Sequence, residues 1–341
     1  SNPLLTNLLK ETIGESFIKH PTDLENFKYH LDDSNVLDKL SEIKQYNKQK
    51  LADEIYKNQG IVINPNSIFD VQVKRIHAYK RQTLNCLRIM DLYNRLIENP
   101  NLDIVPRTFI FGGKAAPGYY LAKNTIELIC KIADVVNNDK KVNDKMKVVM
   151  MENYKVSLAE IIIPATDLSE QISTTTKEAS GTSNMKFMMN GAVTMATLDG
   201  ANIEIKDEVG EDNIIIFGMN AEEVLNYYNY GGYSAWDVCN SNMRLKNVTN
   251  DLINGKYCSD KNRFKSIYEN LLTYNDEFFV LKDFESYITA KDYVNDIYMD
   301  TDKWQKMCGV NIAHSGIFSS DRTITEYATG IWGSTVMYKN L

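Results

Sequence analysis

The sequence lacks several features that would identify its class at once. Its five cysteines are odd in number and form no CxxC pair, so neither a disulfide framework nor a cysteine zinc site is indicated. The four histidines show no metal-ligand spacing, and we predict no metal site. No apolar run approaches the roughly 18–20 residues of a membrane-spanning helix, and we expect no membrane association. This cysteine usage favours a reducing, cytoplasmic environment.

The composition is that of an ordinary globular protein. Of its 341 residues, 43% are hydrophobic and 24% are charged, and the formal net charge is −7. An acidic balance argues against a nucleic-acid-binding protein. The chain begins with serine rather than methionine, and we expect it to be a piece of a longer protein.

Strand and helix patterns alternate in the middle of the chain, which favours a parallel sheet covered on both faces. Such sheets bind ligands in the loops at the carboxyl ends of their strands. We expect a helical lead-in at residues 1–60, an α/β core at 61–220 and a mainly helical portion at 221–341. The predicted strands are 68–73, 108–111, 146–151, 193–198 and 214–217, and the predicted helices of the core are 82–98 and 121–136.

The segment Glu178–Lys186, with the sequence EASGTSNMK, contains a carboxylate, several small residues and a lysine. We predict that a helix begins near Met185. Backbone N–H groups before a helix can hold a phosphate. A common helix cap gives a similar pattern, and its hydroxyl would come from Ser180, Thr182 or Ser183.

Lys186 is the candidate nucleophile of this segment. Lysines are usually solvated, and a lone lysine would not attract attention. Here three apolar residues follow it, namely Phe187, Met188 and Met189. We expect burial beside them to lower the pKa of Lys186 and to make its amine nucleophilic.

A second cluster places four cations and an imidazole within eight residues at a predicted strand-to-helix transition. Cations at such an edge suit phosphate recognition, because arginine offers a planar fork and lysine a mobile charge. A solvated helix start, or a patch facing nucleic acid, would also explain the pattern. The residues are Lys74, Arg75, His77, Lys80 and Arg81.

These segments together resemble the α-glucan (glycogen) phosphorylases. The resemblance extends from about residue 2 to residue 332 and is dense from 64 to 217. It includes a glycine-rich segment, 112–119, which lacks GxGxxG spacing and for which we expect a tight turn. The other matching segments are 64–87, 152–160, 164–173, 178–192, 197–202, 316–324 and 331–332.

The resemblance implies a fold and an activity. Members of this family pair two Rossmann-like domains of the glycosyltransferase-B type, and this chain would be the C-terminal one, a doubly wound parallel sheet without the N-terminal domain. Intact members release glucose 1-phosphate from an α-1,4-glucan with inorganic phosphate, and they are commonly allosteric homodimers. The chain alone would be catalytically weak or inert, because a cleft enzyme needs both walls.

The resemblance also implies a cofactor, pyridoxal phosphate. Lys186 would form a Schiff base with it, and Tyr154 would line its pocket. Its phosphate would act as proton donor and acceptor toward the substrate phosphate. The residues around the cofactor phosphate would be Lys74, Gly181, Thr182 and Ser183.

The substrate residues carried over from the family form two groups. Arg75 and Lys80 would hold the substrate phosphate and, with Lys74, offset the repulsion between two phosphates. The segment that faces glucose would be Glu178, Ala179, Ser180 and Gly181. Two weaker assignments are His77, as a neighbour of this cluster, and Tyr119, which corresponds to an aromatic residue that stacks planar inhibitors in some members of the family.

Two positions depart from the family pattern. Ser183 stands where glycine is usual, and Lys155 stands where arginine is usual. Loss of the planar guanidinium would loosen the corner of the site at Lys155. Two alternatives stay open: a sugar-nucleotide-dependent glycosyltransferase in which Lys186 is structural, and a non-catalytic relative.

Overall fold

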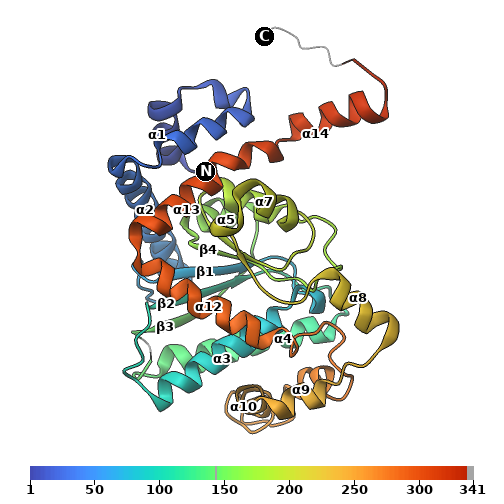
Figure 1. Cartoon of the computed structure of the whole chain (residues 1–341). Coiled ribbons are helices and arrows are strands. Elements are labelled where there is room, and N and C mark those ends of the chain that lie inside the picture. The colour runs from blue at the N-terminus through green and yellow to red at the C-terminus, as the bar shows by residue number, and fades with distance from the viewer. Residues whose placement is uncertain (143, 336–341) are drawn as a thin grey trace.

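The computed structural model describes residues 1–142 and 144–335 (Figure 1). Its centre is a six-stranded sheet in which all neighbouring strands pair in parallel, in the order β3-β2-β1-β4-β5-β6. The strands are β1 (Ile68–Val73), β2 (Arg107–Gly112), β3 (Met146–Met151), β4 (Leu168–Gln171), β5 (Val193–Ala196) and β6 (Ile215–Ile216).

The strand order reverses between β1 and β4. The chain builds outward from β1 through β2 to β3, then crosses back to place β4, β5 and β6 on the other side of β1. Loops leave the carboxyl ends of these two central strands in opposite directions, which opens a crevice between them. The expected doubly wound α/β fold is confirmed.

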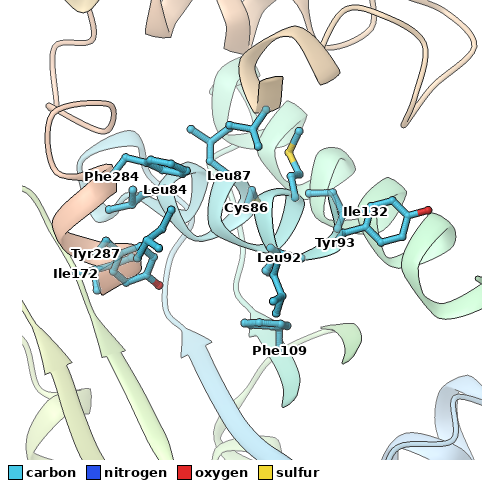
Figure 2. Close-up of a cluster of buried hydrophobic side chains, with 14 of the residues drawn as sticks. Leu84, Cys86, Leu87, Leu92, Tyr93, Phe109, Ile132, Ile172, Phe284 and Tyr287 are labelled. Atoms are coloured by element: carbon cyan, nitrogen blue, oxygen red, sulfur yellow. The ribbon is translucent and has the colours of Figure 1, made fainter. Parts of the chain in front are cut away.

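Helices cover both faces of the sheet (Figure 1). On one face lie α2 (Ser34–Gln59), α5 (Val156–Ala165) and α6 (Ser183–Met189), whose buried side chains pack with Phe69 and Val71 of β1. On the other lie α3 (Gln82–Glu98), α4 (Tyr120–Asn138) and α12 (Phe284–Met299). Figure 2 shows Leu84, Phe109 and Phe284 in this second core, which joins α3, β2 and α12.

The last long helix returns to the beginning of the chain. Ile312 and Ala313 of α13 (Thr301–His314) pack in one cluster with apolar side chains of the lead-in helices. None of the described helices is both long and apolar enough to cross a membrane. The remaining helices and helical turns are α1 (Pro3–Ile13), η1 (Ser16–Ile18), η2 (Pro21–His30), η3 (Ala78–Lys80), α7 (Asn202–Val209), η4 (Glu211–Asn213), α8 (Ala221–Tyr230), α9 (Ala235–Ser241), α10 (Met243–Asp251), α11 (Lys265–Leu271), η5 (Ser315–Phe318), α14 (Ser320–Glu326) and the π-helical turn η6 (Tyr327–Ile331).

Strand β4 was not predicted from the sequence, although it lies at the centre of the sheet. Three of its four residues are polar, namely Ser169, Glu170 and Gln171, and all four are buried. The Glu170 carboxylate accepts a hydrogen bond from the amine of Lys291 on α12. Polar residues are tolerated there because their partners come from distant parts of the chain.

Candidate active site

A pocket of about 500 Å³ lies at the carboxyl ends of β1 and β4. The loops that follow these strands form most of its wall, and α5 and α6 complete it. Apart from the weaker assignments His77 and Tyr119, every residue that the resemblance assigned to the cofactor or the substrate lines this pocket. The lining is Val73, Lys74, Arg75, Lys80, Tyr154, Ala159, Ile163, Gln171, Glu178, Ala179, Ser180, Gly181, Thr182, Ser183 and Lys186.

The loop after β1 carries the cations of the pocket. β1 ends at Val73, and the backbone N–H of Lys74 still donates to the carbonyl of Gly112, 2.9 Å away, so this loop runs beside the loop after β2. A Cβ atom at Gly113 would lie 2.0 Å from the carbonyl oxygen of Lys74. Only glycine permits this approach. The glycine-rich segment therefore packs against the backbone of Lys74 and does not line the pocket.

The amine of Lys74 is held by a residue that the sequence did not single out. Lys74 Nζ donates to Gln171 Oε1 at 2.8 Å, and Gln171 Nε2 donates to Ser169 Oγ at 2.9 Å. Burial, and then the nearby charge of Lys80, lowers the pKa of Lys74 to about 7. No sequence signal marks Gln171, because it lies in the strand that the patterning missed.

Lys80 and Glu178 form an ion pair across the pocket. Both side chains are largely buried, with 12% and 21% of their surface exposed. The Glu178 carboxylate also accepts a longer hydrogen bond, at 3.4 Å, from Ser173 Oγ. The amine assigned to the substrate phosphate therefore pairs with the carboxylate assigned to the sugar.

The loop before α6 does not form the simple helix cap that was an alternative. The helix begins at Ser183, two residues before the predicted start, and Thr182 occupies the N-cap position without a side-chain capping bond. Within residues 1–142 and 144–335, no hydroxyl of Ser180, Thr182 or Ser183 accepts a bond from a backbone N–H of α6. Ser183 is the first residue of α6, a helical position that needs no glycine.

The prediction that Lys186 is buried is wrong for this chain. Phe187 and Met188 are buried in the cores, but the Lys186 side chain is exposed and reaches the pocket. Successive residues of a helix point about 100° apart, so apolar neighbours in sequence do not enclose the lysine between them.

The pocket lining does not include the two weaker assignments, His77 and Tyr119, or the departing position Lys155. The ring of His77 packs edge-on against Tyr119, with the ring centres 4.9 Å apart, and Tyr119 Oη accepts a bond from the backbone N–H of Ala78. Partial burial, and then the charges of Lys80 and Arg75, lowers the pKa of His77. Lys155 is exposed at the start of α5.

The chain is similar to known proteins over nearly its whole length. The profile of the family described as carbohydrate phosphorylase matches residues 1–334. Glycogen phosphorylase of Bacillus subtilis is 52% identical over 333 residues, which is 98% of this chain and 42% of that protein. The liver form of human glycogen phosphorylase is 50% identical over 332 residues, and the Chlamydia pneumoniae glycogen phosphorylase 49%, each over 97% of this chain.

The chain thus spans about two fifths of the length of these relatives, which are named for their action on glycogen. Its match to the family profile covers nearly the whole chain. The resemblance seen in the sequence is therefore confirmed, and the chain belongs to the carbohydrate phosphorylase family.

Proposed function

We propose that this chain is the cofactor- and phosphate-binding part of an α-1,4-glucan phosphorylase, which releases glucose 1-phosphate from a glucan with inorganic phosphate. The observation that carries the proposal is the single pocket in which the cations after β1 meet the Glu178 loop and Lys186. The relatives named glycogen phosphorylase favour this activity over a sugar-nucleotide-dependent transferase. The intact protein would be a cytoplasmic homodimer.

The pocket has the size and lining that pyridoxal phosphate requires. Its volume of about 500 Å³ lies in the range typical of small-molecule sites. Lys186 offers a primary amine for the aldehyde, Tyr154 an aromatic wall, and Gly181 to Ser183 backbone N–H groups for the phosphate. When bound, the cofactor supplies a phosphate group that donates and accepts a proton next to the substrate phosphate.

The chain's own cations make room for two phosphates in one pocket. The positive charges of Lys74, Arg75 and Lys80 offset the repulsion between the two phosphates and stabilise both in the pocket. A phosphate that binds Lys80 competes with Glu178 for its amine. Glu178 is then free to accept a hydrogen bond from a sugar hydroxyl, so phosphate binding prepares the sugar site.

The chain alone is expected to be inert in phosphorolysis. Lys186 and Arg75 are exposed, and a second wall is needed to exclude water and to hold the glucan. Release of glucose 1-phosphate from glycogen should be at background for this chain and should appear when the N-terminal part of a related phosphorylase is added. Phosphorolysis by the chain alone at the rate of an intact enzyme would contradict this.

The proposed cofactor site is tested by chemical trapping. The purified chain is incubated with pyridoxal phosphate, reduced with borohydride, digested and mapped by mass spectrometry. We expect the modification at Lys186. An unmodified Lys186, or the same modification spread over exposed lysines, would contradict the proposal.

The lowered pKa of Lys74 predicts a pH-dependent anion affinity. The amine is charged below its pKa of about 7 and neutral above it, so an anion binds best below pH 7 and loses affinity as the pH rises. Sulfate is the suitable probe, because its own charge stays constant in this range. We expect its affinity, measured by calorimetry, to fall about five- to tenfold between about pH 6 and 9.

The matched control is Lys74→Met, which should bind sulfate weakly with little dependence on pH. An equally steep pH profile in this variant would assign the effect to another group.

A further inference from the structure

Asp199 lies in the turn between β5 and α7 and is 7% exposed. Its carboxylate accepts three hydrogen bonds from successive backbone N–H groups. Thr176 N donates to Oδ1 at 2.8 Å, and Lys177 N and Glu178 N donate to Oδ2 at 3.1 and 2.7 Å. No lysine, arginine or histidine among the described residues forms an ion pair with Asp199. The side-chain hydrogen bonds of Asp199 therefore all go to the backbone of the loop that carries Glu178.

The same turn also holds the far side of this loop. Ala201 N donates to the carbonyl of Ser180 at 2.9 Å. Gly200 has a φ of +53°, and a Cβ atom there would lie 2.6 Å from that carbonyl oxygen. The turn 199–201 thus forms hydrogen bonds with residues 176–178 through the Asp199 side chain and with residue 180 through the backbone.

The loop contains an unfavourable backbone conformation at Thr176. Thr176 has a φ of +78°, a region that β-branched residues rarely enter. Strain of this kind persists only where surrounding contacts enforce it. The contact of Asp199 with the N–H of Thr176 is the one that points that peptide toward the turn.

We propose that Asp199 is a positioning residue for the substrate loop: its carboxylate fixes the peptides of residues 176–178, and thereby the place of the Glu178 carboxylate and of the N–H groups of 179–181 in the pocket. The proposal deepens the proposed function and rests on it for the identity of the ligand. Asp199 itself does not line the pocket. It acts through Glu178, which faces Lys80 across the pocket.

Asp199→Asn is the informative variant. The amide has the same shape, but its NH2 group cannot accept the bonds that a carboxylate oxygen accepts, so at least one N–H of the loop loses its partner. Asp276→Asn is the matched control. Asp276 is also buried and accepts bonds from Val280 N, Leu281 N and Tyr233 Oη at 3.0, 2.7 and 2.9 Å, but it does not line the pocket.

Two measurements on the full 341-residue chain decide the matter. Amide hydrogen exchange should be about tenfold faster at Thr176 and Glu178 in Asp199→Asn, and unchanged there in Asp276→Asn. Calorimetry should give binding of inorganic phosphate that is about tenfold weaker in Asp199→Asn alone, because the N–H groups of residues 179–181 lose their fixed place in the pocket.

Unchanged exchange, unchanged phosphate affinity, or equal losses in the two variants would each overturn the proposal, since general destabilisation explains equal losses. If the parent chain binds no phosphate, the proposed function fails instead. The exchange measurement still decides whether Asp199 positions the loop.

Discussion

Lys186→Arg is expected to abolish covalent attachment of pyridoxal phosphate. Only a primary amine condenses with the cofactor aldehyde, and the guanidinium keeps the positive charge but not that reactivity. After borohydride reduction, the label should fall from about one per chain to background. The absorption of the bound cofactor above 300 nm should disappear in parallel, while the unfolding temperature stays close to that of the parent chain because Lys186 is exposed.

Lys74 is the competing target in this experiment. Its pKa of about 7 leaves a larger fraction of free amine at neutral pH than an ordinary lysine has, and it lines the same pocket. Label on Lys74 in the parent chain, persisting in Lys186→Arg, would contradict the assignment. Lys177→Arg is the control, since Lys177 is exposed beside the pocket but does not line it, and this variant should be labelled normally at Lys186.

The sequence predicted the elements whose apolar pattern is local. The strand at 68–73 and the helix at 82–98 have the predicted bounds in β1 and α3, because each shows an apolar pattern over its own length. β4 was missed for the opposite reason. The residues that keep its polar groups paired, Lys74 and Lys291, stand 97 and 121 positions away in the chain.

The candidate site was predicted from resemblance and located by topology. Patterning alone placed the Lys74 loop after a strand, but it did not find β4, the strand before the Glu178 loop. Their meeting depends on β4 pairing with β1, which a local pattern does not reveal. Asp199 and Gln171 were missed because each acts through a hydrogen bond to a residue that is distant in sequence. The predicted burial of Lys186 failed because it relied on neighbours in sequence rather than in space.

A buried ionic cluster connects β1 with β4. The amine of Lys291, with no exposed surface, donates to Asp70 Oδ2 on β1 at 2.5 Å and to Glu170 Oε1 on β4. Tyr287 Oη donates to the second oxygen of Glu170 at 2.7 Å. Burial, and then repulsion from Asp70, raises the pKa of Glu170 to about 8 against the attraction of Lys291. One lysine thus holds two carboxylates between the strands whose ends form the pocket.

Lys291→Met is therefore expected to cost about 3–5 kcal/mol of the free energy of unfolding, because it removes the cation that pairs with both buried carboxylates. Urea unfolding should show the loss.

Glu170 binds its proton more tightly in the folded state than in the unfolded state, so stability falls as the pH rises from about 4.5 to 8, and loss of Lys291 steepens this fall. The deficit should be smaller at pH 5 than at pH 8. Lys291→Met combined with Glu170→Gln should recover much of it, since one of the two negative charges is gone. A double variant no more stable than Lys291→Met would show that lost packing, rather than unpaired charge, explains the cost.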